Sequence, residues 1–204
     1  MSDQVYVWDK FVRIFHWSLV ALFALSYFTG ESESPIHIYS GYAIVCLLLA
    51  RIVWGFIGSK HARFSDFVKR PAAVIEYAKS MVGGHPKRFL GHNPLGGVMI
   101  LLLLAGLLLT TVSGLKLYAV SEGRGPLAAS WQMSALPQAV ADDDHDDDQR
   151  AESAGEEFWE EVHEAGVNFL ILMIILHVGG VIISSRLHGE SLPKAMLTGY
   201  KRRD

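Results

Sequence analysis

Four of the nine histidines in this chain fall within or at the ends of apolar stretches: His16, His37, His163 and His177. An ionisable side chain at membrane depth is costly and is by default a functional candidate. Imidazole ligates haem iron, although a lone intramembrane histidine often only bridges two helices. The other histidines lie in polar connections or at their edges: His61, His85, His92, His145 and His188.

The interval between His163 and His177 constrains where their rings lie. The two residues are 14 positions apart, which at about 100° per residue is roughly 40° short of four helical turns. Both rings therefore project from nearly the same helix face. Their separation along the axis is about 21 Å, a large part of the ~30 Å hydrocarbon layer. One ring is therefore expected near the outer surface and the other nearer the cytoplasm.

The elements that carry these histidines are long apolar segments. Hydrophobic residues make up 50% of the chain and the mean hydropathy is +0.26, and the apolar blocks reach the roughly 20 residues that a spanning helix needs. Only helices or closed barrels satisfy the backbone in lipid, and the alternation of barrel strands is absent. We predict an all-α, integral membrane four-helix bundle, one domain over 1–204, with spans at about 11–28, 36–57, 95–119 and 162–184.

The distribution of Lys and Arg predicts the direction of the spans. Seven lie in the connection 58–92 and five in the tail after the fourth span, whereas the connection 120–161 holds two. By the positive-inside rule the N- and C-termini and the connection 58–92 are expected to face the cytoplasm. Within that connection, residues 63–81 are amphipathic enough for a short surface helix.

Direction turns the four histidines into two pairs at matched depths. His16 begins an outward-running span and matches His177 at cytoplasmic depth, whereas His37 begins an inward-running span and matches His163 at the outer surface. Two bis-histidine sites in a helix bundle are what two b-type haems require. Cys46 is the only cysteine, which excludes covalent CxxCH attachment and thiolate-held iron–sulfur clusters.

Other uses of these residues stay open. Intramembrane histidines also serve metal-ion transporters, but such proteins usually bring carboxylates to the same depth, and the first three predicted spans contain none. Small residues near the histidines either leave room for a porphyrin or let helices pack closely; they are Gly41, Gly166, Gly179 and Gly180.

Three cations lie near the ends of the spans. Arg51 and Arg13 are placed to bind the propionates of the inner haem, because carboxylates attract Arg. Lys116 is placed similarly toward the outer side. The alternative for all three is that the long side chain reaches the lipid phosphates.

Four sequence segments resemble the bacterial cytochrome b561 family, which is related to the b-type cytochrome subunits of nickel–iron hydrogenases. They are WDKFVRIFHW, IHIYSGY, GHNPLGGVM and HEAGVNFLILMIILHVGG, and together they touch all four predicted spans. The resemblance implies a di-haem four-helix bundle with axial ligands at His16, His37, His163 and His177. It also implies electron exchange with membrane quinone and a redox partner.

The connection 120–161 departs from a short loop. It holds eleven acidic residues after Glu122, including six aspartates around His145. A run of like charges is usually a solvated segment. A sharper hypothesis is a docking surface for a basic periplasmic c-type cytochrome, and a divalent-cation site at His145 is a third.

The leading functional hypothesis is transmembrane electron transfer between the quinone pool and a periplasmic partner, such as a c-type cytochrome or a dehydrogenase subunit. A stand-alone superoxide:quinone oxidoreductase is a second hypothesis, although an acidic outer loop opposes an anionic substrate. A membrane anchor subunit of a hydrogenase or dehydrogenase is a third, and a haem-free transporter or assembly factor is a fourth. Membrane lipid is an expected contact, and no nucleic-acid partner is expected.

Overall fold

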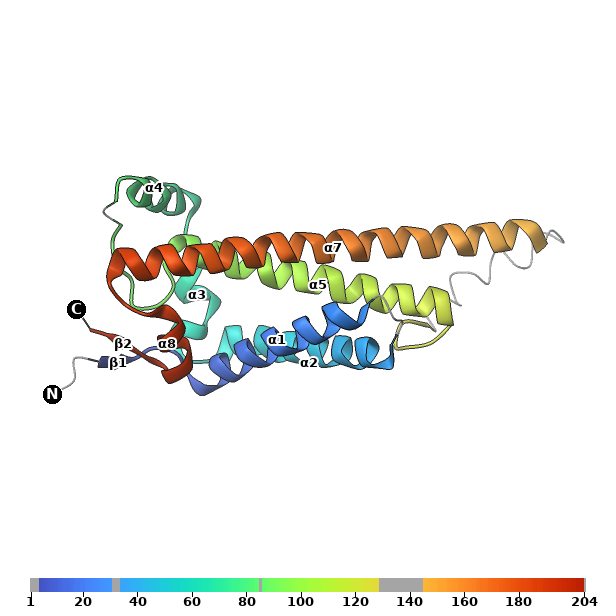
Figure 1. Ribbon diagram of the computed structural model, residues 1–204, viewed down its shortest axis with the longest axis horizontal. Coiled ribbons are helices and arrows are strands. Elements are labelled where there is room, and N and C mark those ends of the chain that lie inside the picture. Colours follow the sequence, from blue (N-terminus) through green and yellow to red (C-terminus); the bar gives the residue numbers. More distant parts are fainter. Residues whose placement is uncertain (1–3, 31–33, 85, 129–144, 204) are drawn as a thin grey trace. The chain divides into compact units, whose positions relative to one another are not determined.

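The computed structural model describes residues 4–30, 34–84, 86–128 and 145–203, most of which are helical (Figure 1). Within this part of the chain, four helices are long and apolar enough to cross a membrane: α1 (Lys10–Thr29), α2 (Pro35–Ile57), α5 (Pro94–Glu122) and the stretch Ala154–His188 of α7 (His145–His188). Each predicted span lies inside one of them. The predicted all-α class with four spans is confirmed.

The fourth helix begins earlier than its apolar stretch. The polar first part of α7 consists of residues 145–161. These residues were predicted to belong to the connection 120–161. A helix satisfies its own backbone hydrogen bonds, so α7 can extend beyond the apolar residues that would lie in the membrane.

Asp9 ties the start of α1 to the end of α2. Its carboxylate accepts a hydrogen bond from the backbone N–H of Val12 at 2.8 Å, as an N-cap does. The same side chain accepts from Trp54 Nε1 at 3.1 Å and from the hydroxyl of Ser59. Burial opposes ionisation of this carboxyl, but the donated hydrogen bonds outweigh it, so the pKa of Asp9 lies below its ordinary value.

Three short helices follow α2 in place of one surface helix. They are η2 (Lys60–Ala62), α3 (Phe64–Phe67) and α4 (Pro71–Val82). The predicted helix over 63–81 is interrupted because Pro71 cannot donate a backbone hydrogen bond and disfavours helical backbone just before it. Phe67 of α3 is fully buried.

The chain forms two compact units. Residues Met1–Leu104 together with Leu172–Asp204 make the first unit, and Ala105–Ile171 make the second.

In the first unit, the N-terminal and C-terminal segments lie together (Figure 1). Strand β1 (Gln4–Tyr6) pairs antiparallel with β2 (Tyr200–Arg202). Val7 and Trp8 form a buried apolar cluster with Ala195 of α8 (Leu192–Thr198). This pairing agrees with both termini facing the same side of a membrane, and the cytoplasmic assignment stays a prediction.

An ion-pair cluster links the connection 58–92 to the C-terminal tail in the first unit. The carboxylate of Glu190 lies 2.9 Å from Arg88 Nη2 and 2.8 Å from Lys201 Nζ. Lys201 also donates to the carbonyl of Phe89 at 3.2 Å. Burial raises the pKa of Glu190, but the bonds from Lys201 and Arg88 more than offset this and hold it below its ordinary value.

In the second unit, glycines allow α5 and α7 to approach closely. A Cβ added at Gly106 would lie 2.9 Å from Leu170, and one added at Gly166 would lie 2.5 Å from the hydroxyl oxygen of Thr110. Gly166 therefore serves helix packing in this structure, which is one of the two roles the sequence left open.

Candidate cofactor site

His16 of α1 and His177 of α7 face one another in the first unit. Their ring centroids are 6.4 Å apart and the rings are inclined by 50°. Both side chains are half-buried. The Nδ1 atom of His16 is buried and has no hydrogen-bond partner among the described residues. The two residues were predicted to pair because they match in depth, and the structure brings them together.

The separation of the two rings matches two imidazoles on one metal atom. A nitrogen–metal bond is about 2 Å long and a ring centroid lies about 1 Å beyond the nitrogen, so two opposed rings on one metal stand about 6 Å apart. The 6.4 Å between His16 and His177 is close to this distance. The distance between the rings of His16 and His177 therefore fits bis-imidazole ligation of iron.

His37, also in the first unit, is anchored through one ring nitrogen. Its Nδ1 lies 2.9 Å from the carbonyl oxygen of Ser26 and 3.2 Å from the hydroxyl of the same residue. A carbonyl only accepts, so the neutral ring must donate from Nδ1–H and carry its lone pair on Nε2. That tautomer is the one in which Nε2 can bind a metal.

His163, in the second unit, shows the same pattern. Its Nδ1 lies 2.9 Å from the carbonyl oxygen of Thr110 and 3.3 Å from the hydroxyl of Ser113. Gly114 admits the ring, since a Cβ there would lie 2.9 Å from His163 Cε1. A carbonyl partner on the far nitrogen is the usual way in which proteins orient a metal-binding histidine. The pairing of His37 with His163 stays a prediction.

Open space adjoins three of the four glycines that were considered for haem clearance. A Cβ added at Gly41, Gly179 or Gly180 would meet no heavy atom within 4 Å. These positions are available to a flat ligand or to lipid, in contrast to the closely packed Gly166.

Two arginines in the first unit carry buried nitrogens with no partner among the described residues, Nη1 of Arg51 and Nε of Arg13. Arg51 is only 3% exposed, donates to the carbonyl of Ala62 at 3.1 Å and lies 5.6 Å from the centroid of the Phe64 ring. Its burial is inconsistent with the alternative in which it reaches lipid phosphates. Lys116 is half-buried in the second unit.

Sequence reasoning missed the burial of His92. Its ring lies 4.5 Å from that of Trp8 and 5.2 Å from that of Phe67. Burial, reinforced by the charge of Arg51 and then of Lys201, lowers the pKa of His92 to about 3. The signal available in the sequence was the motif GHNPLGG, which places this histidine immediately before a span.

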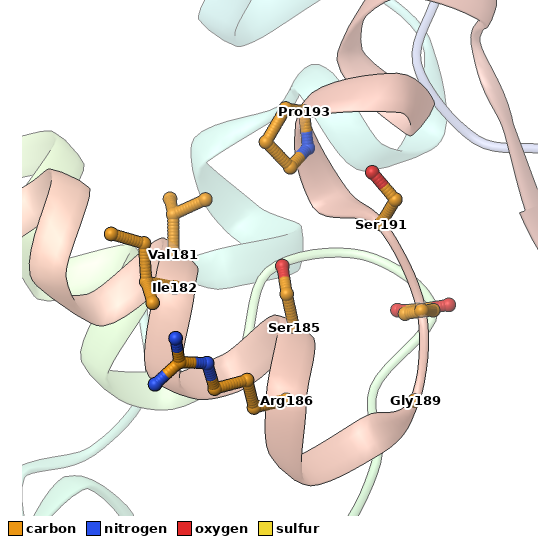
Figure 2. Close-up of a pocket in the computed structure, with 8 residues that line it drawn as sticks. Val181, Ile182, Ser185, Arg186, Gly189, Ser191 and Pro193 are labelled. Atoms are coloured by element: carbon orange, nitrogen blue, oxygen red, sulfur yellow. The ribbon is translucent and has the colours of Figure 1, made fainter.

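A cavity adjoins the C-terminal end of α7. It has a volume of ≈ 410 Å³ and is lined by Val181, Ile182, Ser185 and Arg186 of α7 and by Pro193 of α8, among others. Figure 2 shows the Ser185 hydroxyl pointing from α7 toward Pro193. Val181 and Ser185 follow His177 by one and two turns, so they share its helix face.

Most of the acidic run in the connection 120–161 lies outside the residues whose side chains the structure describes. Asp142–Asp144 are outside the described residues, as are the side chains of His145 and Asp146–Asp148. The predicted cation site at His145 is therefore untested. Among the residues that are described, no group of three or more His, Cys, Asp or Glu could hold a metal ion.

Comparisons with known proteins identify the family. Residues 7–199 match the family described as prokaryotic cytochrome b561. Probable Ni/Fe-hydrogenase B-type cytochrome subunits of Azotobacter vinelandii and Azotobacter chroococcum mcd 1 are each 26% identical, with 98% of this chain and 89% of theirs aligned. The protein of the same description from Rhizobium leguminosarum bv. viciae is 24% identical over the same shares. No solved structure matches significantly. Because the family match runs through all four spans, the chain belongs to the prokaryotic cytochrome b561 family.

Proposed function

We propose that this membrane cytochrome b transfers electrons between membrane quinone and a redox partner on the outer face of a bacterial inner membrane. Family membership establishes membrane electron transfer by a b-type cytochrome and implies haem b. The number of haems, the quinone and the partner are the proposal. The observation that carries it is the approach of His16 to His177, from helices far apart in the chain, at the spacing two axial imidazoles need.

In this proposal His16 and His177 hold an inner haem, and His37 and His163 hold an outer one. When bound, each haem supplies reversible one-electron transfer. Hydrogen bonds to the carbonyls of Ser26 and Thr110 support the outer assignment, because they orient His37 and His163 and leave each Nε2 in its metal-binding form.

Arg51 and Arg13 would balance the negative charge of the inner haem's propionates. Both have a buried nitrogen without a partner among the described residues. A buried guanidinium nitrogen without an acceptor is unfavourable, and a carboxylate is an acceptor that Arg binds strongly. The positive charges of Arg51 and Arg13 would also stabilise the reduced form of the inner haem.

The cavity beyond His177 is the place we propose for a quinone head group (Figure 2). Val181, Ile182 and Pro193 offer an apolar wall, while the hydroxyls of Ser185 and Ser191 can meet a quinone carbonyl. Small-molecule sites typically combine a mostly apolar lining with a few polar groups in this way.

Two kinds of protein are candidates for the redox partner on the outer side. The acidic connection 120–161 would attract a basic c-type cytochrome. The relatives described as hydrogenase B-type cytochrome subunits favour the second candidate, in which this chain anchors a hydrogenase or dehydrogenase subunit. The acidic connection disfavours superoxide as a substrate.

Four single His→Ala variants test the haem assignment through haem content and spectrum. Wild type should bind two haems per chain by pyridine haemochrome assay, and each of H16A, H177A, H37A and H163A should bind one. H16A and H177A should lose the same component of the reduced-minus-oxidised spectrum, and H37A and H163A the other. H188A, on α7 but outside both pairs, is the matched control and should keep two. Retention of both haems in H177A would refute the assignment.

Co-purification of the chain from its native membrane separates the two partner candidates. A tightly bound hydrogenase or dehydrogenase subunit supports the anchor role. A salt-sensitive complex with a c-type cytochrome supports the exchange role, because steering by exposed charges weakens as ionic strength rises.

A further inference from the structure

A second cavity, of ≈ 330 Å³, lies in the first unit between the segment after α2 and the segment before α5. Its ionisable lining consists mainly of cations: Lys60, Lys69, Lys87 and Arg88, with His61 and Asp66. We call it the lysine-rimmed cavity. It uses none of the residues assigned to the haems.

The cations of the lysine-rimmed cavity outnumber the anions available to them. Lys60, Lys69 and Lys87 are exposed, and none makes an ion pair with another described residue. The carboxylate of Asp66 is taken by His61, whose Nδ1 lies 3.0 Å away. The lining of the cavity therefore carries an excess of positive charge.

Two buried nitrogens of the lining lack partners among the described residues. They are Nε of Arg88 and Nδ1 of His92. Arg88 donates from Nη2 to Glu190 at 2.9 Å and to the carbonyl of Arg202 at 2.6 Å, which holds its guanidinium in place, while its Nε–H has no acceptor in the described part of the chain. A buried donor without an acceptor is unfavourable, and a ligand oxygen in the cavity would satisfy it.

His92 also lines the cavity, and cations lie near it. Burial is the main reason that the pKa of His92 falls to about 3, and the charges of Arg51 and then Lys201 lower it further. A bound anion would relieve this accumulation of positive charge.

We propose that the lysine-rimmed cavity binds a phosphate group, carried either by an anionic phospholipid head group or by free inorganic phosphate. Guanidinium and ammonium groups bind phosphate oxygens through charge-assisted hydrogen bonds. The cavity lies at the ends of two membrane spans, where basic pockets meet lipid head groups. Its three lysines and one arginine suit a multiply charged anion.

The test compares K60Q/K87Q with the control K79Q/K194Q in the haem-loaded full chain. The control removes the same charge from exposed lysines that do not line the cavity. Equilibrium dialysis of the delipidated protein in detergent measures inorganic phosphate, and native mass spectrometry measures phosphatidylglycerol against phosphatidylcholine. Removing two cations should weaken binding by about tenfold or more at low ionic strength.

Saturable binding of phosphate, of phosphatidylglycerol or of both, weakened in K60Q/K87Q and retained in the control, supports the proposal. Binding of phosphatidylglycerol alone identifies the lipid as the source, and binding of phosphate alone identifies the free ion. Absence of binding by wild type, or equal binding by both variants, overturns it. An unchanged haem spectrum in both variants shows that the comparison is between folded proteins.

Discussion

Replacing Glu190 with Gln tests whether buried ion pairs hold the C-terminal strand in place. The Glu190 carboxylate lies 2.8 Å from Lys201 Nζ and 2.9 Å from Arg88 Nη2, and the side chains of Glu190 and Lys201 are 9% and 4% exposed. Removing one partner of a buried pair costs about 3–5 kcal/mol because the other charge remains uncompensated. Lys201 keeps the carbonyl of Phe89, so we expect the lower end, about 3 kcal/mol.

Hydrogen exchange of the backbone amides in β2 measures this loss. A change of about 3 kcal/mol corresponds to roughly 100-fold lower protection, if the strand opens locally. The matched control is E76Q, because Glu76 is exposed on α4 and makes no ion pair with another described residue. Equal protection of β2 in E190Q and E76Q would refute the reasoning, since the ion pairs would then contribute nothing to docking.

The same ion pairs can also be tested through the pH dependence of β2 protection. The pKa of Glu190 in the folded chain lies below its ordinary value of 4.5. The stabilisation is therefore fully present above pH 4.5 and is lost as pH falls through the folded pKa. Protection of β2, corrected for intrinsic exchange, should stay constant from pH 8 to about 5 and fall below that. E190Q should lack the fall.

Three further predictions address other described residues. The pKa of His92 in the folded chain is about 3, so between about pH 6.5 and pH 3 only the unfolded chain binds a proton at this residue. Stability measured by thermal unfolding should fall by up to about 1.4 kcal/mol per pH unit as the pH is lowered through this range, and H92Q should flatten the slope. G114A places a Cβ 2.9 Å from the ring of His163, so it should cost about 1–3 kcal/mol in thermal stability and alter the spectrum of the proposed outer haem, whereas an unchanged spectrum contradicts the close contact. D9A should lower stability by about 1–2 kcal/mol through loss of the α1 cap, and D9N should retain most of it; equal melting of the two would contradict capping.

Features that depend on local physics were predictable from the sequence. The four spans follow from the length of each apolar block, because an isolated helix satisfies its own backbone wherever lipid surrounds it. The approach of His16 to His177 was also predictable, since rise per residue and direction of each span place both at one depth. Their role as ligands stays a prediction, as does the pairing of His37 with His163.

Features that depend on contacts between distant segments were not predictable. The burial of His92 between Trp8 and Phe67 needs three segments to converge. The ion pair between Arg88 and Glu190 joins residues 102 positions apart. In both cases the residues themselves carry no periodic signal, because they lie in irregular connections.

The membrane-spanning class and the four helices could be predicted from the sequence alone, because hydropathy and helix geometry act along the chain. The depth of each histidine stays a prediction. The residues that surround those helices became known only from the three-dimensional structure. The structure shows that Gly166 packs closely against Thr110 whereas Gly41 borders open space, and it places several cations around one cavity. The reason is that burial and electrostatic potential are properties of neighbours in space, which the order of residues does not state.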